Sequence, residues 1–472
     1  MSSFRTTGAF GILCLLCFGC TRIPQINDDN GVSSIVNSRI AKDTYWNPGC
    51  YQDERISNAI QELLQQELTA DSAVQIALLN NPQIQEMFEE IGIAQADLVE
   101  AGLFSNPAFD IIFRYPDKSN LKTNIEYTIT QSFIDLFLIP LRIKVAKAEL
   151  EQTTLRVTNE ILDLAFEVEQ TFYELQAAEQ DLKYIKSIVE LTSIHSQLAS
   201  RQRIVGNIYK LDFQQIQSRY LEAKLEIARI QNDIIRLREK LNRLLGFCGD
   251  IQWRISDNLP EIDYQGLSIA CLESVAFSER LDLQSARFDV LRLSRMLGIK
   301  QWWVYTQGRI GIGGVRELEG NNVLGSAFSG EIPIFNYGQA DRMRIRAELR
   351  QAQDHLAALE IQVLSEVREA HKLLMNNLGI INDYRAHIIP LQIEILESSE
   401  ELYNVMGLGV DRLLENKRQE FQAYSNYIMS LRNYWMARVQ LDRALGGKLY
   451  LVLSQMDLEM NMYECNCEGV SE

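Results

Sequence analysis

Residues 331–352, EIPIFNYGQADRMRIRAELRQA, decide the fold, because an extended, proline-containing stretch turns there into a charged helical pattern. The change falls at Asn336-Tyr337-Gly338. Residues 132–153, SFIDLFLIPLRIKVAKAELEQT, make the same change around Pro140. Proline fixes φ and glycine tolerates unusual backbone angles, so both residues suit a junction between a strand and a helix. The sequence therefore predicts two such junctions, one at Pro140 and one at Pro333 and Gly338.

The two junctions belong to a tandem repeat whose copies are offset by roughly 200 residues. Each copy is predicted as helix, strand, strand, long helix, helix. The first copy covers residues 71–250, and a linker at 251–267 leads to the second at 268–447. Strands are expected at about 107–115, 124–133, 302–312 and 324–335. Helices are expected at about 71–104, 140–205, 209–245, 268–300 and 339–406, with a last helix ending at Gly446.

The long helices are predicted to form paired rods. A helix of about 65 residues extends on the order of 100 Å, and the two shorter helices of each copy sum to a similar length. Apolar residues in the long helices follow the alternating three-and-four spacing of coiled coils. Pro390 and Gly379 predict local bends. The spacing runs through Val168, Phe172, Leu175, Leu182 and Ile185, and through Val363, Val367, Ala370, Leu374, Asn377, Ile381, Tyr384, Ile388, Leu391, Ile395 and Leu402.

The predicted strands have one apolar face and one polar face. Ile125, Tyr127 and Ile129 alternate with polar residues, and residues 107–115 follow the same rule. In a soluble sheet the apolar face packs on a core, whereas in an outer-membrane barrel it faces lipid. The smallest such barrels have about eight strands, so the four strands of one chain cannot close one. If the strands span a membrane, several copies must share a barrel, and three copies would supply twelve strands.

Composition and motifs argue against two classes of function. The net charge of −17 disfavours nucleic acid binding, because such a surface repels phosphates. The 472 residues include four histidines and carry no zinc-protease, P-loop or nucleophile-elbow motif. We therefore predict no enzyme, no cofactor and no metal site.

The N-terminal segment has the features of an export signal. Arg5 precedes the apolar run GAFGILCLLCFGC, which resembles a signal core followed by a lipidation site at Cys20, although Cys17 and Phe18 depart from the usual box. We expect residues 1–19 to be a signal peptide, with Cys20 lipidated at the membrane surface. Residues 20–70 are interpreted as a peripheral strap without helical period, and residues 448–472, with Cys465 and Cys467, as a tail.

Over residues 69–446 the chain resembles the outer-membrane efflux proteins, the TolC-like channel-tunnels. The resemblance is carried by the repeat and by ALLNNPQIQ, GIAQADLVEAGLFSNP, IPIFNYGQADRMRIRAE and VGNIYKLDFQQIQSRYLEAKLEI. It implies a mainly α-helical homotrimer with a twelve-stranded β-barrel in the outer membrane and an α-barrel of long antiparallel helices across the periplasm. It also implies partners: outer-membrane lipid, a periplasmic adaptor, and an inner-membrane pump of the resistance-nodulation-division type.

In this family the functional sites line, gate or dock the conduit. The resemblance makes the two hairpin turns candidates for adaptor docking: Val205, Gly206 and Asn207 in the first copy, and Met406, Gly407, Leu408 and Gly409 in the second. Glu397, Glu400, Glu401 and Asp411 are candidates for an acidic ring at the pore gate, which threefold repetition would turn into a field that favours cations. The alternative for the turns is that their glycines only terminate helices. The alternative for the acidic residues is that they form a solvated helix face.

Three questions stay open at this level. If the protein is an export channel, its cargo is small toxic compounds or metal ions, and the sequence does not distinguish between these two classes. The alternative function is a lipid-anchored periplasmic coiled-coil scaffold or adaptor without a pore. Cys248 and Cys271 flank the linker and could pair in an oxidising periplasm, but spacing alone leaves other pairings open.

Overall fold

The computed structural model describes residues 29, 31–47, 54–118, 121–133, 135–249, 251–262, 269–303, 308–330 and 334–451. Cys20, Pro333, Cys465 and Cys467 lie outside these ranges. None of the described helices has an apolar stretch long enough to cross a membrane. The elements are α2 (Val32–Ile40), α3 (Glu54–Gln65), α4 (Ala70–Asn80), α5 (Pro82–Ala101), β1 (Ala108–Arg114), β2 (Asn124–Ser132), α6 (Asp135–Ile204), α7 (Lys210–Leu244), α8 (Ile269–Glu279), α9 (Leu281–Trp303), β3 (Gly308–Arg316), β4 (Asn322–Gly330), α10 (Gln339–Asp383), the π-helix η1 (Tyr384–Ile388), α11 (Ile389–Asn404) and α12 (Val410–Leu445).

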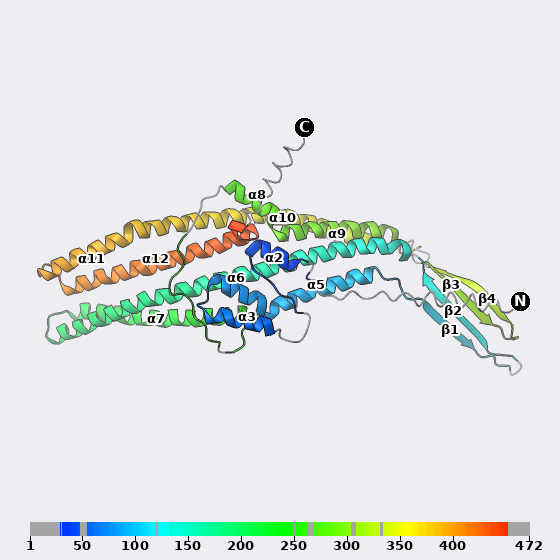
Figure 1. Ribbon diagram of the computed structural model, residues 1–472, viewed down its shortest axis with the longest axis horizontal. Helices are drawn as coiled ribbons and strands as arrows, with labels where there is room; N and C mark the ends of the chain where they lie inside the picture. The colour runs from blue at the N-terminus through cyan, green and yellow to red at the C-terminus, as the bar shows by residue number, and fades with distance from the viewer. Residues whose placement is uncertain are drawn as a thin grey trace, which may run out of the picture. The chain divides into compact units, whose positions relative to one another are not determined.

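The order of elements confirms the predicted fold class, mainly helical with four strands in two similar copies. The chain divides into two compact units, one with the sheet and the helix ends next to it (92–150 and 295–343) and one with most of the helices. In the first unit the strands form one antiparallel sheet in the order β1, β2, β3, β4 (Figure 1). Pairing of β2 with β3 joins the two copies.

Several element boundaries differ from the sequence prediction. The single helix expected at 268–300 is two helices, α8 and α9. The predicted strand at 302–312 begins too early, because α9 continues through Trp303 and β3 starts at Gly308. Tryptophan is common in strands but also tolerated in helices, so the pair Trp302-Trp303 did not mark the boundary. The single helix expected at 71–104 is two helices, α4 and α5, separated at Asn81.

The break at Asn81 has a clear physical cause. Asn80 Nδ2 donates to the carbonyl of Leu245 (2.8 Å), and Asn81 Nδ2 donates to that of Leu244 (2.9 Å), so both asparagines satisfy carbonyls at the end of α7. Gly246 has a φ of 73°, and a Cβ there would lie 2.5 Å from the Asn80 carbonyl oxygen. The break between α4 and α5 therefore lies against the end of α7. This agrees with the expectation that the shorter helices of each copy are arranged along the long one.

The second copy repeats this meeting. Gly446, which ends α12, has a φ of 79°, and a Cβ there would lie 3.3 Å from the Arg280 Cα, at the break between α8 and α9. In each copy the last helix thus ends where two shorter helices are interrupted. Within the helical unit, α6 packs beside α7 and α11 beside α12 as antiparallel hairpins (Figure 1).

The coiled-coil seam of the second copy follows the prediction only as far as Ile381. Val363, Val367 and Leu374 are fully buried, whereas Leu391 and Leu402 are exposed. The π-helix η1 inserts one extra residue into the helical repeat, and Leu396 and Ser399 become the buried positions beyond it. Pro390 follows directly and cannot donate its backbone nitrogen, which accounts for the irregular turn. Gly379 lies in regular helix.

The N-terminal segment is not the irregular strap that we expected. It contains α2 and α3, and Val32, Val36 and Ile40 of α2 are buried at helical spacing. After α2 the chain extends along α4 and α5. Gln75 Nε2 donates to the Asp43 carbonyl (2.9 Å), and Gln85 Nε2 to the Tyr45 carbonyl (2.7 Å). The helical spacing of apolar residues in α2 is therefore present in the sequence, but the polar residues on either side of it led us to predict an irregular segment.

Candidate functional site

The sheet presents its apolar side chains on one uncovered face. Phe109 pairs with Ile129, Ile129 pairs with Ile312, and Ile111 pairs with Tyr127, so these side chains share a face. Phe109, Ile129 and Ile312 are 61%, 52% and 64% exposed. A face of this composition needs an apolar partner. The described part of the chain does not bury it in an interior of its own.

The opposite face of the sheet is mostly polar or small, with Ile112, Val315 and Val323 as its larger apolar side chains. Thr128 pairs with Asp110 on one side and Gly313 on the other. Arg114 Nη2 forms an ion pair with Glu126 at 2.9 Å across β1 and β2. The sheet therefore has the two-sided character that separates an apolar environment from water. Among the described strands, β1 and β4 each pair on one side only, which leaves two open edges.

The first junction lies earlier than Pro140. Strand β2 ends at Ser132, α6 begins at Asp135, and Pro140 lies inside the helix. Pro140 is the sixth residue of α6 and has no N–H to donate to the Leu136 carbonyl, so one backbone hydrogen bond of the second turn is missing. Asp135 is buried and accepts hydrogen bonds from the hydroxyl and the backbone nitrogen of Ser105. Sequence reasoning missed Asp135. It could have been found as a carboxylate in the first turn of a helix, where negative charge is favourable.

The second junction is built around Gly338, which has a φ of 77° directly before α10. Its backbone nitrogen donates to Asn336 Oδ1 at 3.0 Å, and the Tyr337 nitrogen donates to Gln339 Oε1 at 2.9 Å. Arg342 donates to the carbonyls of Tyr337 and Gly338 and lies over the Tyr337 ring. Pro333, the other residue named for this junction, lies outside the described residues.

The two hairpin turns have the same backbone geometry. Asn207 N donates to the Gln202 carbonyl and Gly407 N to the Leu402 carbonyl, both at 2.8 Å, as in a Schellman ending. The left-handed residue is Gly206 in the first turn, but in the second it is Met406, with a φ of 58° and 96% exposure, and not a glycine. The docking candidates Val205, Asn207, Gly407 and Gly409 are exposed and Leu408 is half-buried.

The four acidic gate candidates fall into two environments. Glu397, Glu400 and Glu401 are exposed on α11. Asp411 lies at the start of α12, and its Oδ1 is instead hydrogen-bonded to Nε2 of the buried His195 on α6, at 2.9 Å.

A second ion pair lies near this contact. Arg219 of α7 contacts Glu415 of α12 at 3.2 Å. The arrangement therefore connects the hairpins of the two copies close to their tips. His195 carries no local sequence signal for this role, and reasoning from sequence missed it.

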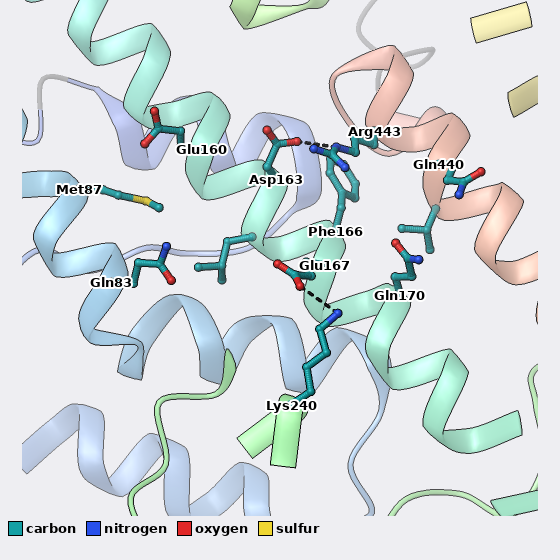
Figure 2. A pocket seen from close by; sticks show the side chains of 12 residues that line it. Gln83, Met87, Glu160, Asp163, Phe166, Glu167, Gln170, Lys240, Gln440 and Arg443 are labelled. Carbon is teal, nitrogen blue, oxygen red and sulfur yellow. Dashed lines mark hydrogen bonds and ion pairs between the residues drawn. The ribbon is translucent and has the colours of Figure 1, made fainter. Parts of the chain in front are cut away.

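A polar groove of about 560 Å³ lies between helices of both copies (Figure 2). Its three acidic residues, Glu160, Asp163 and Glu167, come from α6. Arg443 of α12 pairs with Asp163 at 2.7 Å, and Lys240 of α7 pairs with Glu167 at 2.9 Å. Asp163 and Glu167 are thus paired with bases from neighbouring helices, whereas Glu160 pairs with Arg156 of α6 at 3.1 Å. Within the described ranges, no group of three or more His, Cys, Asp or Glu could hold a metal ion. Cys248 and Cys271 are not joined by a disulfide.

A cluster of charges, buried except for the half-buried Arg438 and the exposed Asp71, joins both copies to the N-terminal segment. Lys448, just after α12, contacts Asp71 of α4 at 2.7 Å and Glu169 of α6 at 3.8 Å, and its backbone nitrogen donates to the Arg39 carbonyl. Asp442 accepts a hydrogen bond from Leu449 N and lies 3.5 Å from Arg438. We call Asp71, Glu169, Arg438, Asp442 and Lys448 the Lys448 cluster.

The Lys448 cluster makes stability depend on pH. Burial raises the pKa of Glu169 from 4.5 to about 7, although Lys448 opposes the shift. Between these values the folded protein keeps a proton that the unfolded chain has lost, so stability falls as pH rises from about 4.5 to 7 and then levels off. Burial also raises the pKa of Asp442, which acts in the same direction. The full change attributable to Glu169 is about 3 kcal/mol.

We expect the melting temperature of the protein in detergent to fall between pH 5.5 and pH 8. Glu169→Gln, which resembles the neutral acid, should lose most of this dependence while remaining folded. Glu179→Gln, in a more exposed ion pair with Arg238, is the matched control and should keep the dependence. An unchanged pH profile in Glu169→Gln would contradict the assignment.

Comparison with known proteins identifies the architecture. Residues 73–247 match the family model described as outer membrane efflux protein. The first copy of the repeat is thus similar to the outer membrane efflux proteins. Its cobalt-zinc-cadmium resistance relative CzcC from Cupriavidus metallidurans is 21% identical over 389 residues, which cover 80% of this chain and 90% of the relative.

Solved structures with the same fold are outer-membrane channels. The Campylobacter jejuni channel CmeC aligns with a TM-score of 0.65 at 14% identity, covering 91% of this chain and 94% of that one. The open state of the Neisseria gonorrhoeae channel MtrE aligns with a TM-score of 0.64 at 14% identity, covering 80% and 89%. The chain therefore shares the TolC-like fold of these outer-membrane channels, and residues 73–247 match the outer membrane efflux proteins.

Proposed function

We propose that this efflux protein is the passive exit duct of a tripartite export system, built from three copies of the chain. The observation that carries the proposal is the uncovered apolar face on a sheet with two open edges. Four strands per chain make twelve in three copies, which exceeds the roughly eight needed for a membrane barrel. A periplasmic scaffold without a pore is the weaker alternative, since it would leave this face in water.

The partners of the duct follow from its hairpin tips. The exposed turns around Val205 and Met406 offer apolar side chains to a periplasmic adaptor, which would connect the duct to an inner-membrane pump of the resistance-nodulation-division type. Cys20 would anchor the mature chain through lipid. The cargo is a small toxic compound or a metal ion. The name of the CzcC relative makes cobalt, zinc and cadmium ions the first cargoes to test.

Fractionation separates the duct from the scaffold. If the sheet spans the outer membrane, Cys20→Ala protein should stay in the outer-membrane fraction and form cross-linked trimers. Release into the soluble periplasm would support the scaffold. Growth of a deletion strain on cobalt, zinc, cadmium, dyes and antibiotics then assigns the cargo class.

The contact between Asp411 and His195 is proposed to hold the periplasmic mouth closed. In planar bilayers, Asp411→Ala should raise the conductance severalfold, because it removes a link between the two hairpins. Glu400→Ala is the control for removing an acid: it should leave the conductance near the original value and lower the preference for cations if the exposed acids line the mouth. Equal conductance of Asp411→Ala and the original protein would refute the closing role.

A further inference from the structure

The chain places positive charge just beyond the junctions, against its overall acidity. Residues 136–148 contain Arg142, Lys144 and Lys147 and no carboxylate. Residues 342–347 contain three arginines and no carboxylate, although the whole chain has a net charge of −17. Stretches that carry positive charge alone in an otherwise acidic protein indicate an anionic partner.

Two side chains of the first stretch, together with Arg295 of α9, are available to such a partner. Lys144 and Lys147 of α6 and Arg295 of α9 are exposed, and none forms an ion pair with a carboxylate of the described residues. Arg295 Nη1 donates to the Lys144 carbonyl at 2.9 Å, which brings α9 and α6 together. By contrast, Arg142 lies 3.5 Å from Asp135. We call Lys144, Lys147 and Arg295 the basic collar.

A second observation locates the membrane interface beside the collar. Phe104, Phe137, Phe335 and Tyr337 are all exposed at the junctions between strands and helices. Aromatic side chains collect at the level of lipid headgroups, where one end of the ring is apolar and the other wet. Lys144 follows Asp135 by nine residues, about 14 Å of helix. With the reach of a lysine side chain and a screening length of about 10 Å, the collar lies within the field of the headgroups.

We propose that the basic collar binds the phosphates of anionic phospholipids in the inner leaflet of the outer membrane. The inference rests on the proposed function, because it requires the sheet to span that membrane. The collar does not include α5, since Asp97 and Glu100 occupy the corresponding end of that helix. Its role is to set the depth of the barrel and to add affinity for charged lipid. Each charge at such a surface contributes roughly a fivefold gain in binding.

The test compares two triple variants with the same loss of charge. Lys144→Gln/Lys147→Gln/Arg295→Gln removes the collar. Lys186→Gln/Lys210→Gln/Lys224→Gln removes three exposed lysines of α6 and α7 far along the chain from the junctions. Both variants and the original protein are placed in nanodiscs of pure phosphatidylcholine or of phosphatidylcholine with phosphatidylglycerol. The melting temperature and the binding of phosphatidylglycerol in detergent are measured.

We expect phosphatidylglycerol to raise the melting temperature of the original protein and of the control by several degrees. The collar variant should lose at least half of this rise and bind the lipid at least tenfold more weakly. An undiminished response of the collar variant, or an equal loss in the control, would overturn the proposal. Conducting trimers that are indifferent to lipid charge would refute the collar alone, whereas the absence of conducting trimers in either lipid would refute the proposed function.

Discussion

Replacing Ile129 with arginine is expected to remove trimers from the outer membrane. Ile129 lies in the central strand β2, on the uncovered apolar face, and pairs with Phe109 and Ile312. An arginine on the lipid face of a barrel costs about 2–4 kcal/mol near the middle of the membrane. Three copies would place three such charges in one barrel. Cross-linked trimers in the outer-membrane fraction, quantified against the original protein, measure the loss.

Thr128→Arg is the matched control for this experiment. It adds the same charge one residue away in the same strand, but on the polar face between Asp110 and Gly313. An arginine there should meet water, so trimers should form at near-normal levels. If Thr128→Arg were as harmful as Ile129→Arg, the assignment of one face to lipid and the other to water would be wrong.

Replacing Lys448 with methionine is expected to lower stability by about 3–5 kcal/mol, because it leaves the buried Glu169 without its cation, whereas Asp442 keeps Arg438. Methionine keeps much of the volume of the lysine stem, so the loss reports mainly on charge. Glu169 and Asp442 are both buried beside this site. The melting temperature in detergent at pH 8 measures the effect, since Glu169 is mostly ionised there. Lys183→Met, in an exposed ion pair with Asp257, should cost less than about 1 kcal/mol.

A double variant separates charge from packing in the Lys448 cluster. Adding Glu169→Gln to Lys448→Met should restore part of the lost stability, because the buried charge without a partner is then removed. The restored fraction should be larger at pH 8 than at pH 5.5. No restoration at either pH would mean that the lysine acts through its packing or through Asp71 alone.

The repeat, the element types and the two-faced strands were predictable from the sequence because each rests on local periodicity. A residue at period two or three and a half reports which side of its own element is apolar. The β1 and β2 boundaries lie within one residue of their predictions, and the seam is correct up to Ile381. These features need no knowledge of which distant residue lies opposite.

The tertiary structure decided the features that depend on distant partners. Asn81 interrupts a helical pattern because it caps α7 more than 160 residues away. Asp411 forms a hydrogen bond with His195, unlike the three exposed acids of α11 with which it was grouped. Lys448 contacts Asp71 and Glu169, two carboxylates of the first copy. The π turn before Pro390 shifts the seam by one residue, an offset that an even repeat cannot reveal. Periodicity records the face of a residue within its element, whereas pairing energies depend on distances that exist only after the elements have packed.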